Sequence, residues 1–354
     1  MKEDKKILLV IHELTYSGSP RSTLNMAIVL RNIYSTVEIW ALEDGGFKEE
    51  LSNYGFDVKI VDEPLAFIPL EERLKAFDLV IANTIFCYEF AYMAQAYVKT
   101  ILYIREAKNI SEIIKNHNIN ASLIRKINYI ICISDYAYHY IRQYHEKSGL
   151  YVVYNYVEDK KWKLRLHRPR FEIFMLMAGT LEYRKGFDVV LQAFEMLENK
   201  KKDRIKLFVM GREVLWDKEY GQYIIEHPDS IYLGEIKDEK AKYQLYSKMH
   251  FIIIPSRDEA CSLVALESAM LGKSLIISDN VGAKYLVNNK NGYIYTTEKP
   301  IELANIFEKI LQDDFLKLHC KIKGYYSRKK YIKYGTKKKY QSCLREVLSE
   351  ILMV

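Results

Sequence analysis

The sequence predicts an α/β protein with two tandem domains, each built on a doubly wound parallel sheet. Its 354 residues exceed the size of one ordinary domain. Short apolar runs recur along the chain, and most are unbroken rather than alternating, as in strands buried on both faces of a parallel sheet. Amphipathic helical stretches separate these runs, and this alternation is typical of βαβ units.

The first half holds strands expected at residues 7–11, 37–41, 58–61, 79–82, 100–104, 129–133 and 151–154, with helices such as 22–32 and 134–146. A polar, basic stretch at 158–170 then indicates an interdomain linker. After it the pattern restarts, with strands expected at 173–178, 205–210, 230–233, 251–255 and 274–278 and helices at 187–198 and 237–248. We therefore expect one domain at 1–165, a second at 166–325, and a basic helix over 326–354.

Composition restricts the class of protein. Hydrophobic residues make up 49% and charged residues 28%, the balance of a folded, soluble protein. The five cysteines are scattered and form no CxxC pair, so neither a zinc site nor a disulfide framework is expected. The apolar run at 7–11 is too short for a signal-peptide core, and no run reaches the roughly 18 residues of a membrane span. These features predict a cytoplasmic protein.

The loop after the first strand, residues 12–20, offers a helix start. Ser19 can cap the helix, Pro20 suits its first position, and Gly18 permits close backbone approach. Free N–H groups at such a terminus bind anions. A single glycine is not a dinucleotide fingerprint. A phosphate site and an ordinary helix start both remain open.

A second loop follows the first strand of the second domain, and it places Arg184 and Lys185 directly before Gly186. Two cations at a strand-to-helix turn suit a pyrophosphate, whose charge must be neutralised as it leaves. The alternative is a solvated basic pair.

The third loop, residues 255–267, ends a buried strand and begins a helix. It carries Glu259, Ser262 as a plausible N-cap, and Glu267. Carboxylates accept hydrogen bonds from paired sugar hydroxyls, and N–H groups near Ser262 and Leu263 would bind phosphate. Because ligands bind at the carboxyl ends of parallel strands, these loops are expected to line one ligand site.

Taken together, these segments resemble the family 4 glycosyltransferases, which have the GT-B fold and retain anomeric configuration. Glu259 and Glu267 match the Glu-x7-Glu motif of that family. The remaining similar segments are 17–20, 153–157, 179–186 and 278–283, so the resemblance covers nearly the whole chain in the family's order. It implies two Rossmann-like domains facing an interdomain cleft, with the C-terminal helix crossing back to the first domain.

The resemblance also implies roles for individual residues. Glu259 would contact the transferred sugar and Glu267 the donor ribose, while Arg184 and Lys185 would bind the pyrophosphate. The other donor-binding residues implied are Gly18, Ser19, Thr180, Ser262 and Leu263. No divalent metal and no other cofactor is expected beside the nucleotide-sugar.

Several positions depart from the family pattern. Thr180 stands where an arginine is often found, and Cys261–Ser262 replace the usual Phe-Gly. Arg105 stands where many members have an active-site histidine. It would bind acceptor or donor, or else form a structural salt bridge with Glu106.

The net charge of +7 is concentrated in one segment, since nine Lys or Arg and no acidic residue lie between Lys321 and Lys339. Tyrosines interleave these cations, which suits adsorption to an anionic membrane surface. A solvated helix face is the alternative, and no nucleic-acid motif accompanies the charge.

These observations predict a retaining, metal-independent hexosyltransferase that moves a sugar from a nucleotide-sugar to a glycan or lipid-linked acceptor. The process would be cell-surface polysaccharide or glycoconjugate biosynthesis, in the cytoplasm or at the inner face of the membrane. A nucleotide-sugar epimerase on the same fold and an inactive scaffold subunit are the alternatives.

Overall fold

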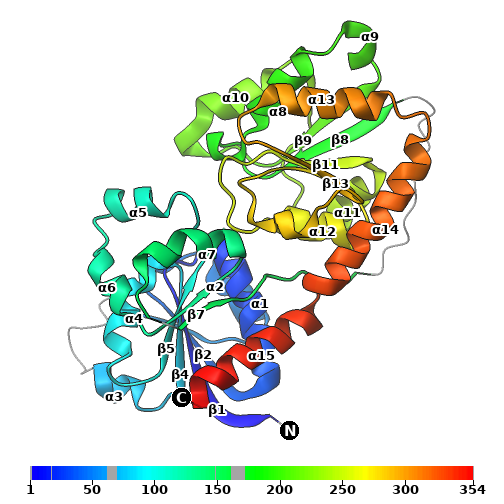
Figure 1. The fold of residues 1–354 in the computed structure, drawn as a ribbon. Helices are drawn as coiled ribbons and strands as arrows, with labels where there is room; N and C mark the ends of the chain where they lie inside the picture. Colours follow the sequence, from blue (N-terminus) through cyan, green and yellow to red (C-terminus); the bar gives the residue numbers. More distant parts are fainter. Residues whose placement is uncertain (1, 17, 62–69, 148, 161–171, 354) are drawn as a thin grey trace. The chain divides into compact units, whose positions relative to one another are not determined.

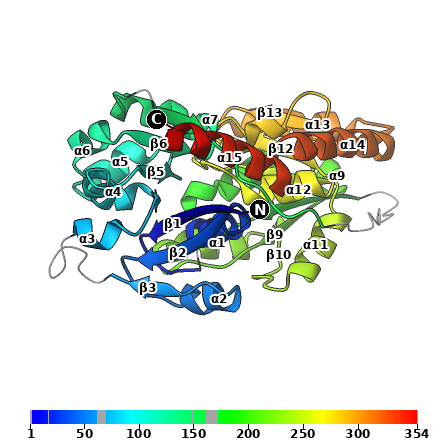
Figure 2. The ribbon, with the colours of Figure 1, turned by 90° about the horizontal axis from the view of Figure 1, so that it is seen from below.

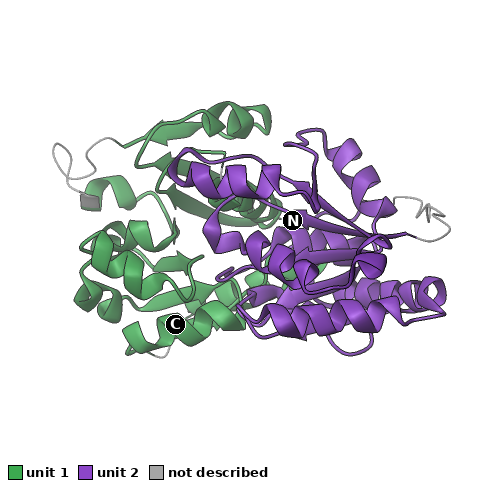
Figure 3. Cartoon of the chain, turned by 90° about the horizontal axis from the view of Figure 1, so that it is seen from above, with its two compact units in different colours: residues 1–155, 338–354 green, residues 156–337 purple. Residues whose placement is uncertain are grey.

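The computed structural model describes residues 2–16, 18–61, 70–147, 149–160 and 172–353. The chain divides into two compact units, which Figure 3 shows in different colours. Unit 1 comprises residues 1–155 and 338–354, and unit 2 comprises residues 156–337. The predicted boundary at residue 165 and most of the predicted linker lie outside the described residues.

Unit 1 contains a seven-stranded parallel sheet with the order β3-β2-β1-β4-β5-β6-β7. Its strands are β1 (Glu3–Ile11), β2 (Tyr34–Ala41), β3 (Val58–Ile60), β4 (Leu79–Asn83), β5 (Thr100–Ile104), β6 (Tyr129–Cys132) and β7 (Gly149–Val152). The central strands β4 and β5 are buried along their whole length, which explains their unbroken apolar sequences.

The helices of unit 1 are α1 (Gly18–Ile33), α2 (Phe47–Asn53), α3 (Leu70–Leu74), α4 (Tyr88–Ala94), α5 (Ile110–Asn116), α6 (Ala121–Lys126), α7 (Asp135–Ile141) and α15 (Lys337–Met353), with short 3-10 turns at Ile85–Cys87 and Arg142–Tyr144. Figure 1 shows α1 and α4 on opposite sides of the sheet, as right-handed crossovers require when the strand order reverses.

Unit 2 repeats the architecture with a six-stranded parallel sheet, in the order β10-β9-β8-β11-β12-β13. Its strands are β8 (Ile173–Ala178), β9 (Ile205–Met210), β10 (Ser230–Tyr232), β11 (Phe251–Ile254), β12 (Ser274–Ser278) and β13 (Gly292–Tyr295). Its helices are α8 (Phe187–Glu195), α9 (Asn199–Lys202), α10 (Lys218–Glu226), α11 (Glu239–Lys248), α12 (Leu263–Met270), α13 (Pro300–Leu311) and α14 (Leu316–Tyr334), with 3-10 turns at Tyr183–Lys185, Leu215–Asp217 and Gly282–Leu286. In Figure 1, α8 and α13 cover one face and α12 and α14 the other.

The predicted α/β class with two parallel-sheet, Rossmann-like domains is confirmed. Strands β5, β8, β9 and β12 have the predicted bounds. Strand β13 was missed: it is a four-residue edge strand in which buried and exposed positions mix, so it lacks the unbroken apolar run of its neighbours.

The expected single basic helix over 326–354 is instead two helices. Helix α14 already begins at Leu316 and ends at Tyr334, and α15 begins at Lys337. Gly335 separates them in a crowded position, where a Cβ would lie 2.7 Å from Leu266 Cδ2. Helix α15 packs in unit 1, where Lys99 Nζ donates to the carbonyl of Ile351 (3.0 Å). Figure 2 shows α15 in red with β1 nearby.

Within the described residues, no helix combines the length and apolar character needed to cross a membrane.

Candidate functional site

The strand order of each unit reverses at one point, and such a switch point is where open α/β sheets bind ligands. In unit 2 the reversal lies between β8 and β11, and in unit 1 between β1 and β4. The loops after β8 and β11 carry Arg184, Lys185 and Glu259. The topology therefore brings the predicted catalytic residues to the switch point of unit 2.

Glu259 is the centre of a compact charge cluster. Lys185 Nζ forms an ion pair with Glu259 Oε2, and Arg184 Nη1 lies 3.6 Å from the same oxygen. The hydroxyl of Ser256 donates to this oxygen as well (3.5 Å). The Glu259 and Lys185 side chains are only 14% and 16% exposed, so their attraction is poorly screened by water.

These contacts set the protonation state of Glu259. Burial raises the pKa of its carboxyl, but Lys185 and Arg184 outweigh burial, and the net pKa lies below its usual range. At neutral pH the site therefore holds a carboxylate with two cations around it. A diphosphate could compete for those cations.

The backbone fixes the positions of these side chains. The N–H of Glu259 donates to the carbonyl of Asn280 (3.2 Å), and its own carbonyl accepts from the N–H of Gly282 (2.7 Å). On the other side, Gly186 adopts φ +67°, and a Cβ there would lie 2.3 Å from the carbonyl oxygen of Pro255. Only glycine permits this approach of the two loops.

Arg257 joins the two loops and was missed in the sequence. Its guanidinium forms a bidentate ion pair with Asp188 (2.9 and 2.7 Å) and donates to the carbonyl of Tyr183 (2.6 Å). Its backbone N–H donates to the carbonyl of Arg184 (2.8 Å). Arg257 lies two residues before Glu259, and this position was the one hint in the sequence that it belongs to the site. Its partner Asp188 lies 69 residues away, so the ion pair itself could not be predicted.

Glu267 lies in a different environment. Its carboxylate accepts from Lys242 Nζ (2.6 Å) and Tyr243 OH (3.4 Å), both on α11. It shares none of these partners with Glu259. Lys242 was another residue missed in the sequence, because nothing local to α11 marks it as a partner of α12.

Three further predicted donor-binding residues lie in these loops. Ser262 caps α12 as predicted, since its hydroxyl accepts from the N–H of Ala265 (3.2 Å), and Leu263 is the first residue of that helix. The hydroxyl of Thr180 donates to Glu182 Oε1 (2.8 Å), and Arg184 Nη2 lies 2.6 Å from the same oxygen. Thr180 thus connects to Arg184 through a shared carboxylate.

The first loop of unit 1 differs from the prediction. Helix α1 begins at Gly18, so Ser19 is inside its first turn and is not the cap. Pro20 is tolerated there because the first N–H groups of a helix have no intrahelical partner. The Ser19 hydroxyl instead accepts from the amide of Asn83 (2.8 Å), which ends β4. Gly18 is exposed, and a Cβ would meet nothing within 4 Å.

Arg105 follows β5 and does not form the alternative salt bridge with Glu106. Its guanidinium donates to Asn83 Oδ1 (2.5 Å) and Ser22 Oγ (2.7 Å) and lies over the ring of Tyr103. The Glu106 carboxylate instead accepts the backbone N–H groups of Arg105 (2.9 Å) and Ile85 (3.2 Å). Arg105 Nη2 is buried and has no hydrogen-bond partner within the described residues.

Comparisons with known proteins identify the family of this chain. Residues 158–338 match the model of "Glycosyl transferases group 1", and residues 3–146 match that of "Glycosyl-transferase family 4". The first match alone spans half of the chain. The chain belongs to the group 1 glycosyltransferases. The resemblance to family 4 glycosyltransferases seen in the motifs is confirmed, and so is the enzyme class.

Curated relatives of this glycosyltransferase match over part of its length. An uncharacterised glycosyltransferase of Methanocaldococcus jannaschii is 28% identical over 40% of this chain and 36% of its own length. The serotype-specific mannosyltransferase WbdA of Escherichia coli is 29% identical over 38% of this chain and 17% of its own length. The chain thus matches about a third of the first relative and about a sixth of the second.

Solved structures match the glycosyltransferase over almost all of its residues. HepE of Anabaena in complex with UDP superposes with a TM-score of 0.81 at 17% identity, covering 98% of this chain and 100% of HepE. The lipopolysaccharide outer core galactosyltransferase WaaB superposes with a TM-score of 0.76 at 14% identity, covering 98% and 99%. At these identities the superpositions show the GT-B fold.

No group of three or more His, Cys, Asp and Glu side chains that could hold a metal ion occurs in the part of the glycosyltransferase that the structure describes.

Proposed function

We propose that this glycosyltransferase transfers a sugar, with retention of configuration, from a nucleotide-sugar to a glycan or lipid-linked acceptor. The process would be cell-surface polysaccharide or glycoconjugate biosynthesis. The observation that carries the proposal is the cluster of Glu259, Lys185 and Arg184 at the β8–β11 switch point. It places two cations and an ionised carboxylate where a parallel sheet binds its ligand.

Each member of the cluster has a task in such a transfer. The bond between the sugar's anomeric carbon and the diphosphate breaks, and a bond from that carbon to the acceptor oxygen forms on the same face. Lys185 and Arg184 would neutralise the charge that develops on the diphosphate. The leaving phosphate would take the acceptor's proton, and Glu259 would accept hydrogen bonds from the transferred sugar.

The proposed donor site extends to the start of α12. The N–H groups of Ser262 and Leu263 belong to the unsatisfied first turn of that helix and would donate to phosphate. Thr180 would help to position the guanidinium of Arg184, because both side chains contact Glu182 Oε1. Glu267 would accept from the donor ribose with one oxygen while Lys242 holds the other. For unit 1, considered by itself, we propose that Gly18 and Ser19 bind phosphate and that Arg105 binds acceptor or donor.

Similar proteins support the choice of substrates. HepE has been solved with UDP and with UDP-glucose, WaaB is a galactosyltransferase, and WbdA is a mannosyltransferase. Each of these names contains a hexose or hexosyl group or a nucleotide, which supports a nucleotide-bound hexose as the donor of this protein. With Lys185 and Arg184 available for the diphosphate, we propose that the reaction needs no divalent metal.

We also propose that unit 2 adsorbs to anionic membrane through exposed cations of the segment 321–339. Some cations of this segment are paired within the protein, which leaves fewer of them to bind lipid headgroups. Arg328 is paired with Asp159 (2.6 Å) and Lys337 with Glu158 (3.2 Å), whereas Lys321, Lys329 and Lys333 are exposed. Each exposed lysine near an anionic surface contributes about 1 kcal/mol. Sedimentation with anionic vesicles at low salt but not at high salt would support adsorption.

The transfer is tested by incubating the protein with a panel of nucleotide-sugars and candidate glycan acceptors, with and without chelator. Product anomeric configuration is read by NMR coupling. We expect transfer with retention, undiminished by chelator. An inverted product would contradict the proposal. Conversion of a donor into its epimer without acceptor would indicate the epimerase, and no turnover of any donor would favour the scaffold.

A further inference from the structure

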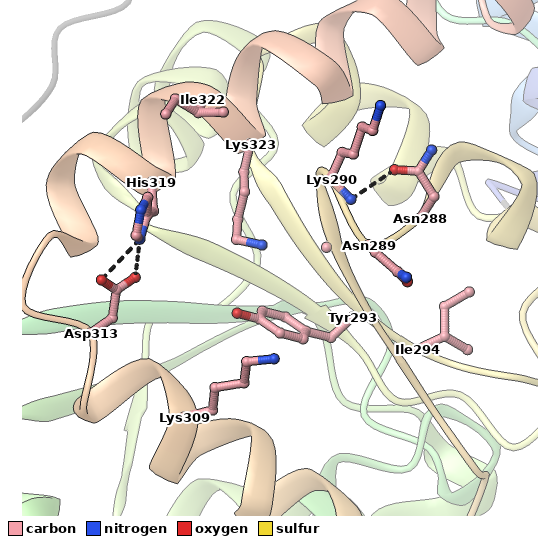
Figure 4. Close-up of a pocket in the computed structure, with 11 residues that line it drawn as sticks. Asn288, Asn289, Lys290, Tyr293, Ile294, Lys309, Asp313, His319, Ile322 and Lys323 are labelled. Carbon is pink, nitrogen blue, oxygen red and sulfur yellow. Dashed lines mark hydrogen bonds and ion pairs between the residues drawn. The ribbon is translucent and has the colours of Figure 1, made fainter.

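Unit 2 contains a polar pocket that shares no residue with the candidate donor site. It has a volume of about 630 Å³ and lies at the edge strand β13, between the end of α13 and the start of α14 (Figure 4). It is lined from the start of β13, beginning at Gly292, whereas Glu259 and Lys185 lie beyond the carboxyl ends of β11 and β8. The pocket therefore lies along the edge strand of the sheet, whereas the donor cluster lies at the carboxyl ends of two central strands.

Three lysines from three separate elements line this pocket. Lys290 precedes β13, Lys309 is on α13 and Lys323 is on α14. Within the described residues, none of the three forms an ion pair with a carboxylate. The one acidic residue in the lining, Asp313, is engaged by His319 Nδ1 (2.7 Å) and by the N–H of Phe315 (3.0 Å). The pocket therefore carries an excess of positive charge.

Two of the lysines converge on one aromatic ring. Lys323 Nζ lies 4.6 Å and Lys309 Nζ 5.8 Å from the centroid of Tyr293, and Figure 4 shows both amines directed at this ring. Burial lowers the pKa of Lys323, and Lys309 lowers it further by like-charge repulsion. Both ammonium groups therefore lie near one ring with no carboxylate paired to either of them in the described residues, and an anion bound beside the ring would offset their like charge.

The remaining lining suits a phosphate carried on a larger group. Burial raises the pKa of the Tyr293 hydroxyl, which therefore stays a hydrogen-bond donor at neutral pH. Asn288 and Asn289 add amide donors, while Ile294 and Ile322 are exposed apolar side chains of the same lining. The volume is within the range of small-molecule sites and exceeds what a bare phosphate needs.

We propose that this pocket binds the phosphate of an organic phosphomonoester, with Lys309 and Lys323 as its charge partners and Tyr293 as a neutral donor. A glycerophosphate group fits this chemistry, either as a soluble molecule or as the headgroup of a phospholipid. The proposal is independent of the transferase reaction, because no residue of the pocket belongs to the donor cluster.

The test measures binding of sn-glycerol 3-phosphate to the full-length protein by calorimetry. In the double variant Lys309→Gln/Lys323→Gln, loss of two charge-assisted hydrogen bonds should weaken binding by about tenfold or more. The matched control Lys218→Gln/Lys240→Gln removes the same charge from exposed positions of α10 and α11 outside the pocket and should change affinity less than about twofold. Equal weakening in both double variants, or no binding to the native protein, would overturn the proposal.

A second measurement covers the case in which the double variant misfolds. Acetylation of lysines in the native protein is followed by peptide mass spectrometry, with and without glycerol 3-phosphate. We expect the ligand to protect Lys323 and Lys309 and to leave Lys218 and Lys240, which are exposed elsewhere in unit 2, unprotected. Protection of all four lysines to the same extent, or of none, would contradict the site.

A third measurement separates the two sources of the phosphate. The native protein is sedimented with phosphatidylcholine vesicles that contain phosphatidic acid, and glycerol 3-phosphate is then added. Release of vesicle-bound protein, together with loss of binding in the pocket variant, would assign a lipid headgroup. Pocket-dependent calorimetric binding, together with vesicle sedimentation that neither glycerol 3-phosphate nor the pocket variant changes, would assign a soluble phosphomonoester.

Discussion

At the switch point of unit 2 cations and carboxylates form ion pairs, whereas at the switch point of unit 1 the partly buried guanidinium of Arg105 donates its hydrogen bonds to neutral side chains. Lys185 and Arg184 surround Glu259. Arg105, in contrast, is held by Asn83 and Ser22 and keeps one buried nitrogen without a partner within the described residues. Equivalent places in two similar sheets therefore carry different electrostatics.

The difference is consistent with separate roles for the two regions. The paired charges of unit 2 keep a carboxylate ionised in a mostly buried place, which suits chemistry on a charged leaving group. In unit 1, Arg105 Nη2 has no acceptor within the described residues. A buried donor without a partner lowers the free energy of unfolding by about 1–3 kcal/mol, and a bound acceptor would remove this cost. Such a group suits recognition of a polar or anionic part of a substrate.

The largest expected effect comes from Glu259→Gln. The amide keeps the size of the side chain but removes the charge that holds Lys185, so transfer should fall by roughly a hundredfold or more. Initial rates with the best donor would measure this, with Glu219→Gln on the exposed side of α10 as the control. Near-native activity in Glu259→Gln would contradict the role given to unit 2, because the paired charges at its switch point would then not be needed for transfer.

Arg257→Met should affect stability most. Asp188 would lose its bidentate partner and keep the hydrogen bond from the hydroxyl of Tyr220 (2.8 Å), which is not charged. Breaking a buried ion pair costs about 3 kcal/mol. Denaturant unfolding checks this, with the exposed Arg212→Met as the control. If Arg257 also positions the loop of Glu259, kcat of Arg257→Met should fall while its affinity for nucleotide changes little. The variant Arg257→Lys should then keep part of the rate that Arg257→Met loses. Equal stability and equal kcat in Arg257→Met and in the control would contradict both roles.

Arg105→Gln should behave in the opposite way, with activity lost but stability nearly preserved. The change removes the hydrogen bonds to Asn83 and Ser22 but also removes a buried nitrogen without a partner in the described residues, and because these two effects oppose each other, the free energy of unfolding should change by less than about 1 kcal/mol. KM for acceptor or donor should rise by about tenfold. Steady-state kinetics and urea unfolding measure the two effects, beside Arg125→Gln on the exposed face of α6. Strong destabilisation with unchanged kinetics would make Arg105 a structural residue.

The smallest effect concerns pH. Burial raises the pKa values of Glu259 and Asp188, but the adjacent cations outweigh burial and hold both below the ordinary values of 4.5 and 3.8. Their stabilisation is therefore present above those values and is lost as pH falls through the folded pKa. In unit 1, burial raises the pKa of the Glu106 carboxyl. The folded state therefore binds a proton more readily than the unfolded state, and the contribution of Glu106 to the free energy of unfolding increases as pH falls.

Acidification from about pH 5 to about pH 3 should thus weaken unit 2 relative to unit 1. Hydrogen exchange, corrected for intrinsic rates, would show this as lower protection in the loop after β11 than in the segment from β4 to β5. The reverse order of protection would contradict the assigned charge states.

Most of the fold could be predicted from the sequence, because strands buried on both faces leave unbroken apolar runs such as that of β8. The interaction of Lys185 with Glu259 could be anticipated only through motif order, since 74 residues separate the two. The partners of Arg257 and Glu267 could not be predicted, because they depend on which loops and helices the sheet order brings together. Ser19 was misassigned because Pro20 fits several positions of a first turn, not only the first.

The most direct test of the account is thermal unfolding of the native protein and of Lys185→Gln with UDP, GDP, dTDP, ADP and CMP, each with and without chelator. A nucleotide at a hundredfold excess over its Kd stabilises the protein that binds it by about 2.7 kcal/mol. We predict that one nucleoside diphosphate raises the Tm of the native protein regardless of chelator and that Lys185→Gln loses most of this rise. No rise with any nucleotide, or an equal rise in Lys185→Gln, would contradict a donor site at the β8–β11 switch point.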